Sequence, residues 1–224
     1  MLNIKTFQVN PLQENCYVVS DDTHACVIID CGAFYDSERQ AITEYISYKN
    51  LTPIHLLCTH GHFDHNFGNN TIFETYGLQP EIHSEDASMI KDIAMQCDMM
   101  GMGIDYDRTT PPVEHLLKDN ELITFGNHTL KVIYTPGHSK GSVIFYCEEE
   151  NVLFTGDTLF RLSVGRTDLP GGSWSELMNS LEDKISTLPK DTVAYPGHGP
   201  KTILNEEFRM NPYFHEIFLS KDKV

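Results

Sequence analysis

Basic residues are scarce in this sequence. Its 224 residues include 16 lysines and arginines against 32 aspartates and glutamates, which gives a formal net charge of −16. Such a charge repels the phosphate backbone of a nucleic acid, and no run of Lys and Arg offsets it locally. We therefore expect no nucleic-acid partner.

Long apolar runs and paired cysteines are also missing. No apolar run approaches the length of a membrane span, and the first seven residues lack the basic segment followed by an apolar stretch that marks a secretory signal. The six cysteines form no Cys-x-x-Cys pair, and several lie in apolar, strand-like runs, which indicates reduced core thiols. These features predict a soluble, cytoplasmic protein with no membrane partner.

Length and hydrophobic pattern predict the fold class. A chain of this length can bury a substantial core, and we expect one domain over residues 1–224. Both halves are β-rich and contain helical spacing, which favours an α/β protein with two stacked sheets covered by helices on their outer faces. The expected strands are 7–9, 16–19, 25–29, 54–58, 122–125, 130–134, 143–146, 152–154 and 193–195, and the expected helices are 36–48, 173–187 and 204–219, with another starting at 84–86.

Seven side chains able to bind metal fall in four short clusters, each just past a short apolar run. Imidazole nitrogen and carboxylate oxygen suit zinc, iron or manganese, and a set this rich can hold two divalent ions that share one carboxylate. The pattern predicts a metal-dependent hydrolase. The seven residues are His60, His62, Asp64 and His65 in the first cluster, then His138, Asp157 and His198.

The sequence around each cluster favours ligation. The Pro-Gly-His sequences at 136–138 and 196–198 end a strand and turn the chain, so each projects one histidine over a sheet edge. His60 and His62 are two positions apart in an extended segment and can face the same ion. Asp157 follows a buried-looking strand, where a lone acid is costly unless a cation neutralises it. A bridging carboxylate fits that position.

A structural interpretation competes at each position. A single histidine near a turn is usually a solvated or core residue, Asp64 could cap a helix, and Asp157 could form a turn. None of these alternatives explains three histidines within positions 60–65. The six histidines outside the clusters show no such grouping, and we expect structural roles for them.

These motifs resemble the metallo-β-lactamase superfamily. The sequence His-Gly-His-Phe-Asp-His at 60–65 is followed by the other three ligand positions in that family's order, and Asp-Cys-Gly at 30–32 is similar to its early Asp-x-Gly turn. The resemblance implies an αββα sandwich of two mixed sheets flanked by helices. The Asp-His pair at 64–65 and the Gly-rich segment 165–172 are similar to compact, single-domain relatives of glyoxalase II.

The resemblance also implies a site and a reaction. Two ions, zinc first and iron or manganese as alternatives, can lower the pKa of a bridging water from about 15.7 to roughly 7. Attack on a thioester carbonyl is then favoured, because the departing thiol has a pKa of about 8.5 and leaves easily as a thiolate. His60, His62 and His138 would bind the first ion, Asp64, His65 and His198 the second, and Asp157 both, with Asp64 and Asp157 as catalytic carboxylates.

The substrate and two rival functions stay open at this stage. The larger glyoxalase II enzymes hold glutathione with an added C-terminal helical domain, whereas this sequence ends soon after His198. We therefore expect a small-molecule thioester as the substrate, with weaker binding of any glutathione part than in those larger enzymes. Arg166 is the first candidate to bind a substrate carboxylate, and Lys140 is the second. Persulfide dioxygenases of the same superfamily resemble this motif set but use one iron, and a metal-binding protein without turnover is the other alternative. The sequence does not give the oligomeric state.

Overall fold

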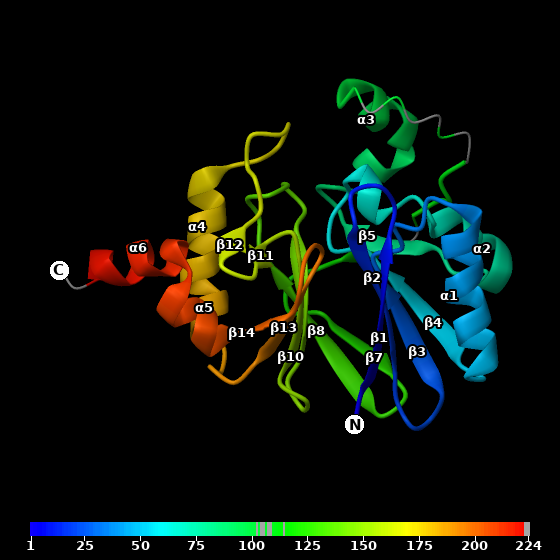
Figure 1. Ribbon diagram of the computed structural model, residues 1–224, viewed down its shortest axis with the longest axis horizontal. Helices are drawn as coiled ribbons and strands as arrows, with labels where there is room; N and C mark the ends of the chain where they lie inside the picture. The colour runs from blue at the N-terminus through cyan, green and yellow to red at the C-terminus, as the bar shows by residue number, and fades with distance from the viewer. Residues whose placement is uncertain (102, 104–105, 107–108, 114, 222–224) are drawn as a thin grey trace. The chain divides into compact units, whose positions relative to one another are not determined.

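The contacts within the computed structural model divide the chain into two compact units (Figure 1). The described residues are 1–101, 103, 106, 109–113 and 115–221. The first unit comprises Met1–Leu117 with Thr124–His128, and the second comprises Lys118–Ile123 with Thr129–Val224. The single domain expected over residues 1–224 stays a prediction.

The first sheet is mixed and has six strands in the order β1-β2-β3-β4-β5-β6. The first three strands pair antiparallel, as the predicted meander requires, and β3 to β6 pair parallel. Parallel neighbours need a crossover, which α1 (Asp36–Tyr48) provides before β4 and α2 (Asn69–Tyr76) before β5. The strands are β1 (Asn3–Val9), β2 (Glu14–Ser20), β3 (Ala25–Ile29), β4 (Thr52–Leu57), β5 (Pro80–His83) and β6 (His115–Leu117).

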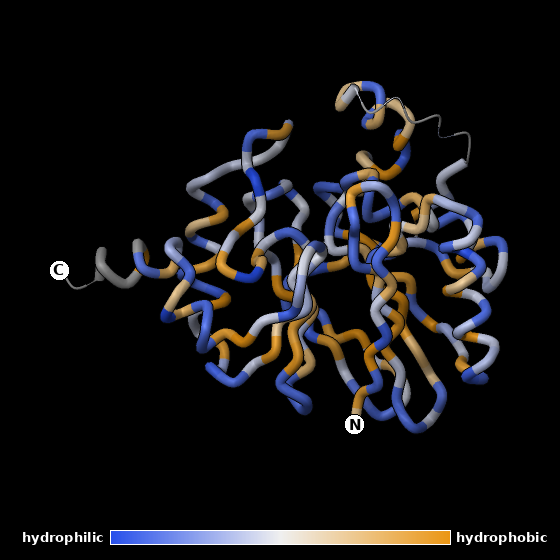
Figure 2. The backbone as a smooth tube through the Cα atoms, viewed as in Figure 1, coloured by the Kyte–Doolittle hydropathy of each residue, from blue (hydrophilic) through white to orange (hydrophobic). Residues whose placement is uncertain are grey.

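Helices α1 and α2 cover one face of this sheet. Ile42 and Ile46, four positions apart on α1, and Ile72 on α2 are buried and pack with Val18 and Ile28, which lie on the same face of the sheet. Figure 2 shows apolar segments along the strands and mostly hydrophilic loops at the strand ends. The helix predicted over 36–48 is confirmed because its apolar spacing matches the face that it buries.

The second sheet is also mixed and six-stranded, in the order β14-β13-β10-β9-β8-β7. Strands β8, β9 and β10 pair antiparallel, and β13 runs parallel to β10. Helices α4 (Trp174–Asp183), α5 (Leu204–Met210) and α6 (Pro212–Lys221) pack on it through a common core. The strands are β7 (Leu122–Phe125), β8 (His128–Tyr134), β9 (Val143–Cys147), β10 (Val152–Gly156), β13 (Val193–Pro196) and β14 (Thr202–Ile203), and β11 (Leu159–Phe160) and β12 (Ser163–Val164) form a separate hairpin. The predicted class of two mixed sheets with flanking helices is confirmed.

The helix predicted to start at 84–86 was wrong. The Asp86 carboxylate accepts a hydrogen bond from the Gly61 amide at 2.9 Å instead of capping a helix, and the chain runs through turns there. Helix α3 (Ile93–Met99) begins only after Asp92, whose side chain accepts a hydrogen bond from its first turn at 3.0 Å.

Two further predicted helices are each interrupted in the structure. The segment 173–187 is α4 followed by a short 3₁₀ helix, η3 (Ile185–Thr187). The tail predicted over 204–219 is broken at Asn211, which is extended because it precedes Pro212. Among the described residues, none of these helices has the length and apolar content needed to cross a membrane.

The six cysteines lie in the core as unbridged thiols, as predicted. Burial raises the pKa of Cys26 and of Cys147 to about 12, and that of Cys97 to about 11. A thiol with such a pKa holds almost no thiolate at neutral pH, so these side chains behave as small apolar residues.

Asp21 joins two turns of the first unit through a buried hydrogen-bond network. Its carboxylate accepts from the Thr23 amide and hydroxyl, from the Asn127 amide at 2.6 Å and from His128 Nδ1 at 3.1 Å. Burial alone would raise the pKa of Asp21, but these hydrogen bonds outweigh it and lower the pKa well below its ordinary 3.8.

Replacing Asp21 by alanine should lower the free energy of unfolding by about 1–3 kcal/mol, because it leaves several donors without an acceptor. Because the pKa of Asp21 is lower in the folded than in the unfolded protein, its ionised carboxylate stabilises the fold above about pH 4. That contribution to the free energy of unfolding is lost as the pH falls further. Urea unfolding of the metal-free protein at pH 6 and pH 3 measures both effects. The difference between wild type and Asp21→Ala should shrink at pH 3, and an equal difference at both pH values would contradict the network's role.

Candidate metal centre

The first cluster of predicted ligands lies in the loop directly after β4. His60, His62, Asp64 and His65 are each at most 7% exposed. The ring centroid of His60 is 4.8 Å from that of His62 and 4.2 Å from that of His65, and Asp64 Oδ2 is 3.8 Å from His65 Nε2. The 3₁₀ turn η1 (Phe63–His65) bends the chain so that the last two ligands return to the first two. The structure therefore brings these four predicted residues together within the first unit.

Gly61 and Asn66 fix the shape of this loop. A Cβ on Gly61 would lie 2.9 Å from the carbonyl oxygen of Asp86, so a larger residue does not fit. Asn66 Nδ2 donates to the carbonyl oxygens of His60 at 3.1 Å and His62 at 2.7 Å. These contacts hold the loop in shape independently of any ligand.

A buried carboxylate, Asp30, supports two of the histidines. Its Oδ2 accepts from Thr59 Oγ1 at 2.7 Å and from His65 Nδ1 at 3.0 Å. Because the Thr59 hydroxyl donates its proton to Asp30, it accepts from His60 Nδ1, which is 3.0 Å away. The network thus assigns the Nδ1–H tautomer to both His60 and His65, and their Nε2 atoms carry the lone pair that a metal needs.

Glu14, at the start of β2, is a second carboxyl group near His65. It is fully buried, and its Oε1 lies 3.9 Å from His65 Nδ1. Burial raises the pKa of Glu14 well above its usual range, which favours the neutral form. A neutral Glu14 adds no second negative charge beside Asp30.

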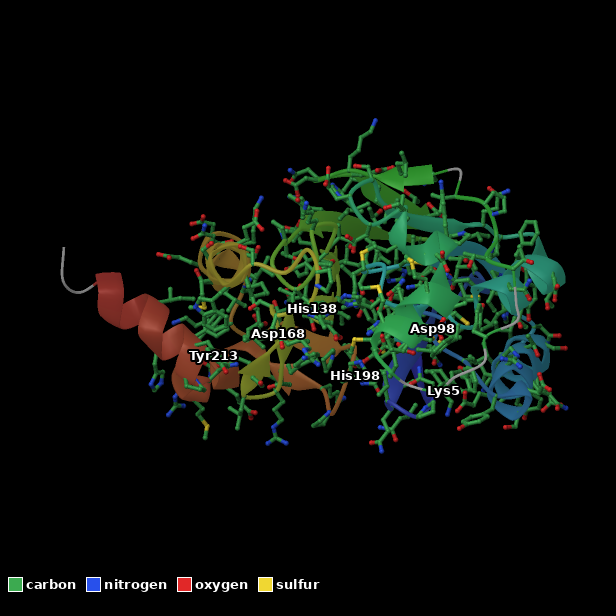
Figure 3. The ribbon with its side chains drawn as sticks, turned by 90° about the horizontal axis from the view of Figure 1, so that it is seen from above. Lys5, Asp98, His138, Asp168, His198 and Tyr213 are labelled. Carbon is green, nitrogen blue, oxygen red and sulfur yellow. The ribbon has the colours of Figure 1, made fainter. Side chains whose placement is uncertain are left out.

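The other three predicted ligands come together in the second unit, where Figure 3 labels His138 and His198. Strands β8, β10 and β13 run in the same direction, so the residues after them lie at one edge of the sheet. His138 Nε2 is 3.5 Å and His198 Nε2 is 3.7 Å from Asp157 Oδ2. Two ligand atoms bound to one tetrahedral ion at about 2.1 Å would lie about 3.4 Å apart. The spacing around Asp157 therefore fits a divalent ion.

Backbone groups orient His138. Its Nδ1 donates to the carbonyl oxygen of Arg166 at 2.8 Å, so its Nε2 is the atom that can bind metal. A Cβ on Gly165 would lie 1.8 Å from the carbonyl oxygen of Asp157, and one on Gly137, whose φ is 139°, would lie 2.3 Å from the Leu177 nitrogen. Glycine is needed at both positions for these close approaches.

The predicted substrate-binding side chains lie at the surface. The Arg166 guanidinium donates to Asp168 through Nε at 2.7 Å and Nη2 at 2.8 Å, in a two-point ion pair whose members are both more than half exposed. The hydrogen bonds from Arg166 lower the pKa of Asp168 to about 2. Lys140 is exposed, and its carbonyl oxygen accepts the Tyr134 hydroxyl at 2.8 Å. The carboxylate-binding roles of Arg166 and Lys140 stay predictions.

Sequence reasoning missed the residues that orient the ligands. Asp30 carried one signal, the Asp-x-Gly turn at 30–32, but nothing in the sequence tied it to Thr59 or His65. The carbonyl of Arg166 was missed because only its side chain was considered. By contrast, His128 pairs with Asp21, and His55 and His115 both pair with the Glu81 carboxylate. These contacts are of the structural kind expected for histidines outside the clusters.

Comparison with known sequences identifies the family. The family model of the metallo-beta-lactamase superfamily matches residues 9–198, which is most of the chain. The chain belongs to the metallo-β-lactamase superfamily. The glyoxalase II-like branch within it is a finer assignment that this match does not make.

Two similar proteins are named as hydrolases, one in general terms and one with a substrate class. The probable metallo-hydrolase YqgX of Bacillus subtilis is 36% identical over 94% of this chain and 97% of its own length. The hydroxyacylglutathione hydrolase GloC of Haemophilus influenzae is 29% identical over 96% of this chain and 99% of its own.

Two crystal structures resemble the fold closely. The BLEG-1 B3 metallo-beta-lactamase is 36% identical with a TM-score of 0.86, over 96% of this chain and 99% of that one. TTHA1623 in a di-iron-bound form is 35% identical with a TM-score of 0.81, over 93% of this chain and 99% of that one. The fold and a general metallo-hydrolase identity follow from these likenesses.

Proposed function

We propose that this protein hydrolyses small thioesters, in the manner of glyoxalase II, with two divalent ions. The observation that carries the proposal is the donor geometry within each unit, where ligand atoms lie 3.5–3.8 Å apart. Buried hydrogen-bond acceptors also orient three of the imidazoles. The proposed ligands are His60, His62 and His138 for one ion, Asp64, His65 and His198 for the other, and Asp157 for both.

The proposed ions would supply Lewis acidity, which makes water nucleophilic near neutral pH and polarises a carbonyl group. Asp30 and the Arg166 carbonyl favour a proton on the Nδ1 atoms of His65 and His138, which leaves the Nε2 lone pairs of both rings available to bind metal. Asp64 and Asp157 are the proposed catalytic carboxylates, and each would accept a hydrogen bond from the attacking water.

Thioesters suit a site of this composition. Water attacks the acyl carbon, a C–O bond forms, the C–S bond breaks, and the products are a carboxylic acid and a thiol. A thiolate leaves without a general acid because the thiol pKa is near about 8.5. The reaction therefore requires no general acid in addition to the seven proposed metal ligands.

The likeness to GloC over nearly the whole of both chains supports a glutathione thioester as the substrate class. The di-iron form of TTHA1623 supports two ions and makes iron an alternative to zinc. We also propose a cytoplasmic location, because six unbridged thiols persist best in a reducing compartment. The similarity to BLEG-1 favours one second candidate, hydrolysis of a β-lactam, which is likewise an acyl transfer to water.

Elemental analysis of protein purified without added metal should find close to two transition-metal ions per chain, since seven ligands exceed the needs of one ion. Removing both ions with a chelator should abolish turnover, and restoring zinc, iron or manganese should rank the metals by rate. One iron in a fully active preparation would contradict the dinuclear proposal and favour the dioxygenase alternative.

Activity assays then separate the functions. We expect S-lactoylglutathione to be hydrolysed at a rate that saturates only weakly with its concentration. Simpler acyl thioesters should compete well with it for the enzyme. Oxygen uptake with a glutathione persulfide tests the dioxygenase, and a chromogenic cephalosporin tests the β-lactamase. A metal-loaded protein with no thioesterase activity would contradict the proposal of thioester hydrolysis, whichever other assay is positive.

Arg166→Ala should raise KM by roughly tenfold for a glutathione thioester and leave kcat nearly unchanged, because it removes uniform binding of a carboxylate. Asp168→Asn should lower that KM, because Asp168 now occupies two donors of Arg166. A thioester without a carboxylate is the control substrate and should respond to neither change. Unaltered KM values in both variants would rule out Arg166 as the carboxylate binder.

A further inference from the structure

The hairpin β11–β12, together with the two residues that follow it, contacts all three proposed ligands of the second unit. The segment after it provides the Arg166 carbonyl that accepts His138 Nδ1, and Gly165 packs against the backbone of Asp157. In β11, the Phe160 ring lies 6.1 Å from the His198 ring, at 81°. This segment therefore helps to position the three side chains.

The tip of the hairpin is held by a buried acid rather than by its own side chains. Leu162, at the tip, has φ of 57°, which is unfavourable for a branched residue, and its side chain is 41% exposed. Its amide donates to Glu207 Oε2 at 2.9 Å. The next carbonyl, that of Ser163, accepts from Asn211 Nδ2 at 3.2 Å. A backbone conformation of this kind persists only where its surroundings impose it.

Glu207 is itself fixed on every side that the structure describes. It lies on α5, is fully buried, and accepts from Asn211 Nδ2 at 2.8 Å and from Thr202 Oγ1 at 2.6 Å, as well as from Leu162. Asn211 is also fully buried, in the break between α5 and α6. A buried carboxylate requires several hydrogen-bond donors. Two of the three donors to Glu207, those of Thr202 and Asn211, lie near it in the sequence, and the third is the Leu162 amide of the hairpin.

We infer that Glu207 is a positioning residue that acts through the β11–β12 hairpin on His138. Glu207 and Asn211 fix Leu162 and Ser163, the hairpin carries this constraint to Arg166, and the Arg166 carbonyl holds the proton of His138 on Nδ1. The Arg166 carbonyl favours the Nδ1–H tautomer of His138 whether or not the protein is a thioesterase. The consequence for metal binding rests on the function proposed above.

The test uses the metal-free, full-length protein. Nitrogen-15 NMR of the imidazole rings should find His138 as the Nδ1–H tautomer in the wild type. In Glu207→Ala, the Leu162 amide, the Asn211 amide group and the Thr202 hydroxyl all lose their acceptor, so the hairpin should loosen and a mixture containing the Nε2–H tautomer should appear. Glu206→Ala changes an exposed neighbour on the same helix and should leave the His138 signals unchanged. Circular dichroism checks that both variants are folded.

Cobalt titration, followed by absorption, gives the second measurement. Loss of a group bonded directly to a ligating histidine typically weakens metal affinity by about 10–100-fold. Glu207 acts on His138 through the hairpin, so we expect an effect at the lower end, about tenfold, in Glu207→Ala only. If Glu207→Ala does not fold, Asn211→Ala carries the same test, with a smaller change in the same direction.

A folded Glu207→Ala protein with the wild-type tautomer would overturn the inference, even if the protein is a thioesterase. If the wild type binds no cobalt, the proposed function fails, whereas the tautomer measurement still decides the role of Glu207.

Discussion

Replacing Asp157 by alanine is expected to remove metal and turnover together while the fold survives. Asp157 Oδ2 lies within 3.7 Å of the Nε2 atoms of both His138 and His198, so its loss affects every proposed ligand of the second unit. Losing metal catalysis costs several kcal/mol of transition-state stabilisation, which corresponds to a rate lowered by more than about a thousandfold. Elemental analysis, hydrolysis rates and circular dichroism on one preparation measure the three quantities.

Asp183→Ala is the matched control for this change. Asp183 is an exposed acid at the end of α4, on the same unit, and its removal also alters the net charge by one. We expect unchanged metal content and rate in this variant. Retained metal and turnover in Asp157→Ala would show that Asp157 only forms the turn after β10.

The ligand clusters could be predicted because local chemistry sets them apart. Three histidines within 60–65 have no structural explanation in the sequence, and the Pro-Gly-His turns at 136–138 and 196–198 mark strand ends directly. The helix over 36–48 was equally accessible, because its apolar spacing is regular. Each of these signals lies within a few positions along the chain.

The elements that were missed have weak local signals. Strand β6 has three residues, and in β5 the polar Glu81 and His83 interrupt the apolar pattern. Glu81 is satisfied by histidines on the two neighbouring strands, which no local window contains. The false helix start at 84–86 has the same cause, because Asp86 bonds to Gly61, 25 positions away.

The support of the candidate site is also non-local. Asp30 lies 35 positions from His65, Arg166 lies 28 from His138, and Glu207 lies 45 from Leu162. A metal ligand must present a particular atom type, which restricts the residue at that position. A group that supports a ligand must only accept a hydrogen bond in the right place. A backbone carbonyl, such as that of Arg166, serves as well as a carboxylate and leaves no trace in the sequence.

Asp30→Asn is expected to weaken metal binding by about 10–100-fold and to lower the stability of the metal-free protein by about 1–3 kcal/mol, because buried donors lose their acceptor. An asparagine can still accept from the Thr59 amide, which Asp30 Oδ1 does at 2.7 Å. Its amide nitrogen would then face the Thr59 hydroxyl and His65 Nδ1, both of which now donate. His65 can avoid that clash by moving its proton to Nε2, and the lone pair that a metal needs is lost.

Two rates of metal release to a chelator, one for each ion, show which ligands depend on Asp30. His65 belongs to the second proposed ion and bonds to Asp30 directly, whereas His60 belongs to the first and bonds through Thr59. We therefore expect the second ion to be lost faster than the first. Asp98→Asn, at an exposed position on α3, is the control and should leave both rates and the urea midpoint unchanged. Wild-type release rates in a folded Asp30→Asn protein would mean that the tautomers of His60 and His65 are fixed by something other than this carboxylate.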